Sequence, residues 1–219
     1  MDPEVLKSYL PRYAEAFLLT IKIGWLGIAL AFVIGMLSAF VIHFRIPVLK
    51  RIAGYYVELF RNTPLLVQLF FIYFGLPKVG IVISAEACGV LGLGLLGGSY
   101  MSETFRSGLE AIPAAQKESA LSLGMSRGQV FREIILPEAL TISVPAIAAN
   151  VIFLLKETSV FSAISLMDLM FTAKDLIGLY YDTTEALFML VLFYTIMLLP
   201  VSILGSIAEK TVRGKMPGQ

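Results

Sequence analysis

Residues Ala111–Leu140, AIPAAQKESALSLGMSRGQVFREIILPEAL, form a polar, helix-forming stretch in a chain that is otherwise almost entirely apolar. Pro113 suits the first turn of a helix, where the missing N–H of proline costs no hydrogen bond. Gly124 stands where a helix commonly ends in a left-handed residue. Ser126 and Gln129 have the spacing of a capping box, in which each side chain accepts a hydrogen bond from the other's backbone. The pattern predicts a helix, a glycine turn and a second helix.

The second of these helices should be short and amphipathic. Phe131 and Ile135 are four residues apart and give it an apolar face. Pro137 predicts its end, because the residue before a proline is disfavoured in the α conformation. Two interpretations of the helix–turn–helix stay open on this pattern: a structured connecting loop, and a docking element for a soluble partner protein.

The composition of the chain is that of a membrane protein. Hydrophobic residues make up 58% and charged residues 15% of the 219 positions, and the mean hydropathy is +0.83. Soluble domains carry roughly 45–50% apolar and about 25% charged residues. The apolar runs have the length of transmembrane helices. We therefore predict an all-α integral membrane fold, with residues 1–219 forming a single transmembrane domain.

The sequence has only one cysteine and one histidine, which excludes most kinds of catalytic site. The single cysteine, Cys88, rules out an intrachain disulfide and a thiolate metal cluster, and the single histidine, His43, leaves no histidine-based catalytic group. No G-x-x-x-x-G-K-[ST] motif is present, so we expect no ATP site in this chain. The G-x-G-x-x-G match at Gly92–Gly97 lies in an apolar run, where close helix packing explains it better than a dinucleotide site. We expect no catalytic residue, metal, cofactor or nucleic-acid contact.

Five segments are long and apolar enough to cross a bilayer core, which takes about twenty residues. Pro64 should divide the second segment into an interfacial or kinked first half and a spanning second half, and Pro145 should kink the fourth. The run Val160–Phe171 is too short to cross and is typical of a re-entrant or surface helix, with Thr158 or Ser159 as its N-cap. The five predicted spans are Phe17–Ile42, Ile52–Pro77, Ile83–Glu103, Ala139–Leu155 and Ala186–Ile207.

The distribution of lysine and arginine predicts the orientation. With the N-terminus outside, the inside segments hold most of the basic residues, and the positive-inside rule therefore favours N-out, C-in. Residues 111–138 then lie in the cytoplasm, which favours the docking interpretation. The N-terminus lacks a basic n-region, so we expect no cleavable signal peptide. The inside residues are Arg45, Lys50, Arg51, Lys117, Arg127, Arg132, Lys210, Arg213 and Lys215, against Lys78, Lys156 and Lys174 outside.

Ionisable residues at membrane depth are candidates for a polar path. A charge near the bilayer centre costs about 2.5–3.5 kcal/mol on insertion scales, so it is normally paired or lines a water-filled route. Both interpretations, structural ion pair and path lining, stay open for three close pairs. Residues 156–159 are the best path candidates, because a broken helix there exposes backbone groups. The three pairs are Glu58 with Arg61, Glu103 with Arg106, and Lys156 with Glu157.

Several motifs resemble a known family. Glu118–Gly124 reads E-S-A-x-x-x-G and precedes Ile134-x-Leu136-Pro137, which resembles the EAA loop of ABC-importer permeases, with Ser119 where the family usually has alanine. Three further motifs resemble the polar amino acid permeases of the histidine/glutamine/arginine type. They are Glu58–Gln68 (ELFRNTPLLVQ), Tyr100-x-x-Glu103-x-x-Arg106, and Asn150 with Lys156-x-Thr158-Ser159.

The resemblance covers roughly Ala16 to the C-terminus, with Ala115 and Asn62 where the family commonly has glycine. It implies the membrane-spanning subunit of an ATP-driven importer of polar amino acids, cationic ones slightly favoured. Implied partners are two ATPase subunits that bind ATP and Mg, a second permease copy (identical or a paralogue), an extracytoplasmic substrate-binding protein and the lipid bilayer. The implied location is the inner membrane of a prokaryotic cell.

Two alternatives to the importer remain from the residues themselves: an ion-gradient-driven secondary transporter of small polar solutes, and a membrane anchor or assembly protein. The candidate residues form two sets. The set expected to couple to an ATPase is Ala115, Glu118, Ser119, Ala120, Gly124, Ser126 and Arg127. The set expected along the substrate path is Arg61, Asn62, Thr63, Gln68, Glu103, Asn150, Lys156, Glu157, Thr158 and Ser159.

Overall fold

The chain folds as a bundle of helices. The structure is a computed structural model that describes residues 2–213, and every regular element in that range is helical, which confirms the all-α prediction. The α-helices are α1 Pro3–His43, α2 Leu49–Arg61, α3 Leu65–Phe70, α4 Ala85–Glu110, α5 Ala114–Ser122, α6 Arg127–Gln129, α7 Leu136–Glu157, α8 Leu169–Tyr180 and α9 Thr183–Arg213. Two π-helical turns, η1 Phe71–Gly75 and η3 Val130–Ile135, and two 3-10 turns, η2 Leu76–Val79 and η4 Thr158–Ile164, join them.

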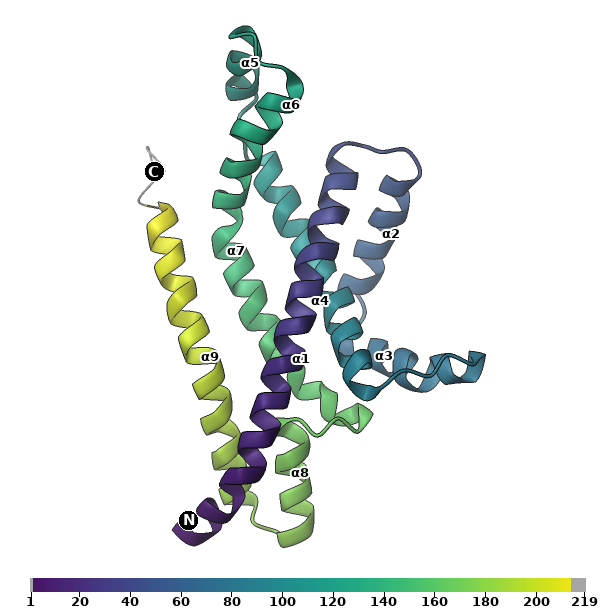
Figure 1. Ribbon diagram of the computed structural model, residues 1–219, viewed down its shortest axis with the longest axis vertical. Coiled ribbons are helices and arrows are strands. Elements are labelled where there is room, and N and C mark those ends of the chain that lie inside the picture. Colours follow the sequence, from purple (N-terminus) through teal and green to yellow (C-terminus); the bar gives the residue numbers. More distant parts are fainter. Residues whose placement is uncertain (1, 214–219) are drawn as a thin grey trace.

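The long helices run side by side along the bundle (Figure 1). Helix α4 packs against α1, α2 and α7, and α7 packs against α9. The N-terminus and α8 lie at one end of the bundle, whereas the α1–α2 turn, α5 and α6 lie at the other (Figure 1). The short helices α3 and η2 project sideways from the bundle.

The glycines of α4 allow its neighbours to come close. A Cβ on Gly97 would lie 2.6 Å from the Leu154 side chain of α7 and 2.7 Å from Cβ of Ala31 on α1. A Cβ on Gly94 would lie 2.5 Å from the Leu30 side chain. Small residues at such crossings drive helix association where lipid removes the usual apolar transfer energy. The packing interpretation of the G-x-G-x-x-G match is therefore confirmed.

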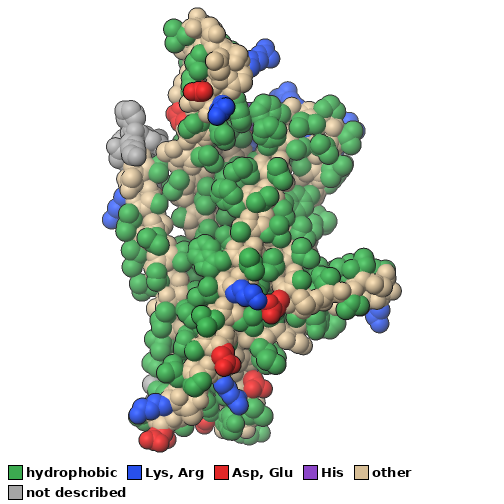
Figure 2. All heavy atoms as spheres, viewed as in Figure 1, with side chains coloured by type: hydrophobic (Ala, Val, Ile, Leu, Met, Phe, Trp, Pro, Cys, Tyr) green, Lys and Arg blue, Asp and Glu red, His purple; other side chains and the backbone are tan. Residues whose placement is uncertain are grey.

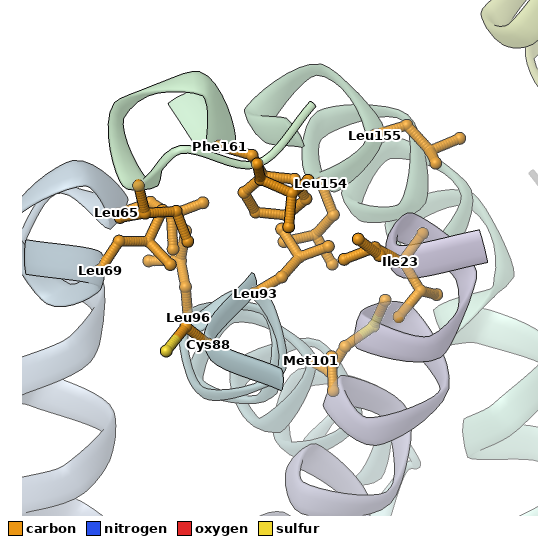
Figure 3. Packing of buried hydrophobic residues seen from close by; sticks show 14 of the residues in the cluster. Ile23, Leu65, Leu69, Cys88, Leu93, Leu96, Met101, Leu154, Leu155 and Phe161 are labelled. Atoms are coloured by element: carbon orange, nitrogen blue, oxygen red, sulfur yellow. The ribbon is translucent and has the colours of Figure 1, made fainter. Parts of the chain in front are cut away.

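The main core lies where α1, α4, α7 and η4 meet. Ile23, Leu93, Leu154 and Phe161 are fully buried there and point toward one another (Figure 3). The outer surface is also largely apolar: hydrophobic side chains cover most of the face in Figure 2, with a few charged side chains among them. A bundle that is apolar both inside and outside is suited to lipid, because water would penalise that surface.

Among residues 2–213, three helices are long and apolar enough to cross a membrane: α1, the continuous segment 127–164 that contains α7, and α9. The pair Leu49–Arg61 and Leu65–Val79, bent by 107°, makes a fourth if it is counted as one span. Helix α4 has sufficient length but carries many glycine and serine residues, since most of its surface faces other helices rather than lipid. The number of five spans and the N-out orientation stay predictions.

Pro137 does not end the second helix of the polar stretch, contrary to the prediction. It lies in the first turn of α7, and the helix continues to Glu157. The preceding π-helical turn explains this, because the Leu136 N–H bonds to the Phe131 carbonyl five residues back. The wider turn changes the spacing of the carbonyls that a proline ring would otherwise meet. The polar stretch is thus joined to a membrane helix without a break.

The division at Pro64 is confirmed, because the two halves, Leu49–Arg61 and Leu65–Val79, meet at an angle of 107°. Helix α2 runs beside α1 and α4, and the second half projects sideways (Figure 1). Gln68 holds the bend, since its Nε2 donates hydrogen bonds to the Phe60 carbonyl (3.1 Å) and the Thr63 carbonyl (2.9 Å). These bonds satisfy carbonyls that the break in the helix would leave without partners.

The predicted N-cap of the short helix after α7 is wrong. Residues 158–164 form the 3-10 turn η4. The N-cap of α8 is Asp168, ten residues after Thr158. The Asp168 carboxylate accepts a hydrogen bond from the Phe171 N–H at 2.9 Å. Thr158 instead donates to the Leu155 carbonyl and is fully buried.

Candidate transport path and coupling loop

An ion cluster joins α2 to α4. Arg61 on α2 lies 3.6 Å from the Glu103 carboxylate on α4, and Arg106 donates to the same carboxylate. Arg106 also pairs with Glu110 one turn further along, at 2.7 Å. The Arg61 guanidinium lies 5.5 Å from the centre of the Tyr100 ring, within range of a cation–π interaction. Glu103 and Tyr100, which share one face of α4, therefore both hold Arg61.

These charges face open hollows rather than the packed core. A hollow of about 310 Å³ between α4 and α7 and a second of about 550 Å³ beside α2 share Arg61, Tyr100 and Glu103 as lining residues. The Arg61 and Glu103 side chains keep 39% and 34% of their surface exposed. Ion pairs with this exposure are weakly held, because water screens them. Both groups are accessible to a charged ligand.

Helix α7 contributes neutral polar groups to the smaller hollow. Asn150 donates from Nδ2 to Oγ1 of Thr104 at 2.9 Å, and both residues line the hollow. Ser143, two turns before Asn150 on the same face of α7, donates to the Ala139 carbonyl and lies 3.3 Å from the Thr104 carbonyl. Amide and hydroxyl groups beside opposite charges suit a ligand that has both an ammonium and a carboxylate.

The structure brings only part of the predicted path set together. Arg61, Glu103 and Asn150 share the smaller hollow, and Asn62 lines the larger one. Gln68 is 6% exposed and holds the α2–α3 bend. Thr63, which lies between α2 and α3, donates a hydrogen bond to the Leu59 carbonyl.

Residues 156–159 lie elsewhere. Lys156 and Ser159 line a mostly apolar groove of about 660 Å³ between α7 and α9, which has no lining residue in common with the two charged hollows. Thr158 is buried within 3.3 Å of the Tyr194 hydroxyl. Glu157 is half-buried at the last residue of α7. The two parts of the path set therefore occupy separate surfaces of this chain.

The predicted path set left out Tyr100, Thr104 and Ser143, although all three line the smaller hollow. Tyr100, Glu103 and Thr104 have the i, i+3, i+4 spacing of one helix face, so the signal was present once Glu103 was selected. Ser143 carried no such signal, because only the packing of α7 against α4 brings it to the hollow.

The predicted coupling loop, residues 111–138, has the helix, glycine turn and capping box that the sequence indicates. Gly124 adopts φ +88°, in the left-handed region, directly after α5. Both bonds of the capping box are present: the Ser126 N–H donates to Gln129 Oε1 at 2.8 Å, and the Gln129 N–H donates to Ser126 Oγ at 3.3 Å. Pro113 precedes the first residue of α5 and forms its N-cap. The helix–glycine turn–helix prediction is confirmed.

The loop has a small core of its own and an outward face. Ala120 is 3% exposed and packs in a cluster with Leu109, Val130 and Ile135. Gln116 donates to the Glu138 carboxylate at 2.5 Å and so joins α5 to α7. The other predicted coupling residues are exposed, namely Ala115, Glu118, Ser119, Gly124, Ser126 and Arg127. One buried anchor thus supports six accessible positions.

Comparison with known proteins identifies the family. Residues 31–215 match the model of the binding-protein-dependent transport system inner membrane component. The chain belongs to this family. It is therefore a multi-pass inner membrane protein and the membrane subunit of an ABC transporter, a permease rather than an enzyme.

Relatives align with this permease over most of their length. It is 31% identical to a probable amino-acid permease of Bacillus subtilis (strain 168) over 215 residues, which cover 97% of this chain and 96% of that one. It is 32% identical to the arginine transport system permease of the same organism, covering 93% and 94%. A probable glutamine ABC transporter permease of that organism is 35% identical, with 75% of each chain covered.

Solved structures share the fold of the permease. A crystal structure described as an amino acid ABC transporter with histidines superposes with a TM-score of 0.90 at 32% identity, covering 96% of this chain and 99% of that one. The methionine ABC transporter in an inward-facing conformation superposes with a TM-score of 0.79 at 20% identity, covering 97% and 99%. The second likeness shows the fold alone.

Proposed function

We propose that this permease moves polar amino acids, and that Arg61 and Glu103 contact the substrate on its way. The observation that carries the proposal is the accessible pair of opposite charges, 3.6 Å apart, at a hollow also lined by Asn150 and Thr104. The names of the relatives, which include arginine and glutamine permeases, support an amino acid as the substrate class. Arginine, histidine and glutamine are the first candidates, with a slight preference for cationic ones.

The geometry supports exchange of one ion pair for another. An α-carboxylate can replace Glu103 beside Arg61, and an α-ammonium can replace Arg61 beside Glu103, so the substrate leaves no charge unpaired. Arg106 remains bound to Glu103 and Glu110 throughout, which keeps the Glu103 carboxylate in place. Bound charges near the membrane centre are costly unless paired, so this exchange lowers the barrier to passage.

The exposed face of α5 and α6 is the proposed docking surface for an ATPase subunit, which binds ATP and Mg itself. Glu118, Ser119 and Arg127 would contact the ATPase, while Gly124 sets the angle between the two helices. The helix that starts at Arg127 continues to Ile164 and carries Asn150. A displacement of the loop therefore reaches the hollow through one continuous helix. This is a two-state, rigid-body mechanism.

Two copies of the ATPase and a second permease copy, identical or a paralogue, complete the proposed assembly. A substrate-binding protein on the opposite side of the membrane delivers the amino acid. The family description, a component of a binding-protein-dependent system, supports such a protein. The apolar outer surface supports contact with lipid and with a second permease.

Uptake of labelled amino acids into proteoliposomes tests the proposal. The permease is reconstituted with the ATPase and binding protein that co-purify with it, and arginine, histidine and glutamine are compared. We expect uptake only when ATP is present in the compartment that the coupling loop faces. We also expect the transported amino acid to stimulate ATP hydrolysis. Uptake driven by an imposed ion gradient without ATP would instead establish the secondary-transporter alternative.

A further inference from the structure

The turn between α1 and α2 concentrates positive charge that no acidic side chain of residues 2–213 pairs with. Arg45, Lys50 and Arg51 are exposed, and none of them forms an ion pair with another residue of the part that the structure describes. The first turn of α2 contains no acidic residue. Cations at this end of a helix are disfavoured by the helix dipole. Their position is therefore not explained by the stability of the helix.

Exposed apolar side chains alternate with these cations. Phe44, Val48, Leu49 and Ile52 keep between 45% and 69% of their surface exposed. A surface that combines basic groups with large apolar side chains is typical of protein at the boundary between lipid headgroups and acyl chains. Neither an aqueous loop nor a purely lipid-facing helix needs both kinds of residue.

The turn lies at the base of the coupling loop rather than at its tip. The Phe44 ring packs 4.9 Å from the Phe131 ring, which belongs to the π-helical turn that precedes α7. Helices α5 and α6 extend further from the bundle than the turn does (Figure 1). The turn is thus level with the point where the chain leaves the membrane-spanning bundle.

The backbone of the turn is held in an unfavourable conformation. Arg45 has φ +52° and Val48 has φ +67°, both in the left-handed region. Side chains other than glycine rarely adopt it, and a β-branched residue such as valine least of all. Such strain persists where the surroundings fix the segment, and it is frequent at binding sites.

We propose that Arg45, Lys50 and Arg51 bind the phosphate of an anionic phospholipid headgroup, while Val48 and Leu49 enter the acyl boundary. The occupant follows from charge complementarity and from the level of the turn in the bundle. This lipid site is separate from the charged hollow, and it does not depend on which solute the permease carries.

Native mass spectrometry of the purified complex tests the site, with phosphatidylglycerol and phosphatidylcholine as the two probes. The wild type should retain phosphatidylglycerol more tightly, and the preference should weaken as ionic strength rises. The triple variant R45Q/K50Q/R51Q should lose roughly tenfold or more in phosphatidylglycerol affinity and nothing in phosphatidylcholine affinity. The exposed position of the three residues leaves the fold intact.

A second triple variant, K7Q/K78Q/K174Q, removes the same charge from exposed lysines outside the turn and serves as the control. It should keep the wild-type preference for phosphatidylglycerol. An equal loss of phosphatidylglycerol affinity in both triple variants would show that net charge alone causes the effect, and would overturn the proposal. An unchanged preference for phosphatidylglycerol in R45Q/K50Q/R51Q would overturn it as well. If R45Q/K50Q/R51Q lost the co-purifying ATPase but kept the preference for phosphatidylglycerol, the turn would be a contact for a protein partner instead of a lipid site. Failure of amino acid uptake would leave the lipid result unaffected.

Discussion

Asn150 on α7 donates a hydrogen bond to Oγ1 of Thr104 on α4, at 2.9 Å. This bond connects the helix that continues the coupling loop to the helix that carries Glu103. Thr104 in turn donates to the backbone carbonyl of Tyr100, the residue whose ring lies beside Arg61. The relationship therefore joins the loop, the polar hollow and the ion cluster in one set of contacts.

The Asn150–Thr104 bond should contribute to coupling more than to assembly. In N150A or T104V, we expect substrate-stimulated ATP hydrolysis to fall several-fold while the ATPase still co-purifies. The double variant should lose little more stimulated hydrolysis than either single variant, because the effects of mutating two residues that share a bond are not additive. T141V is the matched control, since Oγ1 of Thr141 bonds only to the Pro137 carbonyl of its own helix. Additive losses in the double variant would show that the two side chains act independently.

Neutralising Glu103 should impair transport. E103Q leaves Arg61 and Arg106 without their shared carboxylate, and hydrogen bonds to charged groups contribute about 1.5–3 kcal/mol each. We expect amino acid uptake to drop roughly tenfold or more, with the bundle still folded, because the cluster is partly exposed and screened. E86Q is the control: it breaks the Lys22–Glu86 pair, which lies outside both hollows. Uptake by E103Q at the wild-type rate would remove Glu103 from the path.

A bulky residue at Gly124 should disrupt the coupling loop. G124V forces a β-branched side chain into φ +88°, and left-handed backbone costs about 1–2 kcal/mol for residues other than glycine. We expect reduced retention of the ATPase or loss of stimulated hydrolysis, while membrane insertion is unchanged. G128A is the control, because Gly128 has ordinary backbone and open space around it. Normal stimulated hydrolysis in G124V would contradict the coupling role.

The crossing of α4 with α1 and α7 should tolerate no side chain at Gly97. In G97V, the new side chain overlaps Leu154 and Ala31. Overpacking of this kind typically costs about 1–3 kcal/mol, so the melting temperature of the purified protein should fall. G54A is the control, since a Cβ at Gly54 meets nothing within 4 Å. An unchanged melting temperature in G97V would mean that the helices separate easily at this crossing.

Local features of the loop could be predicted because they depend on neighbours in the sequence. The left-handed Gly124 and the Ser126–Gln129 capping box involve residues at most three apart, and both are confirmed. Pro137 and the Thr158 cap were predicted wrongly by the same local rules. A π-helical turn before Pro137 and the burial of Thr158 against Tyr194 outweighed the local preferences.

The composition and apolar runs determined by themselves that this protein is a helical membrane protein, since lipid selects for long apolar helices. The motif order likewise determined its family, which the comparisons confirm. Only the tertiary structure decided which charged residues meet. Arg61 pairs with Glu103, forty-two residues away, rather than with nearby Glu58, and residues 156–159 face a different groove. Side chains distant in sequence become neighbours only through helix packing, and glycine contacts such as Gly97 against Leu154 set that packing.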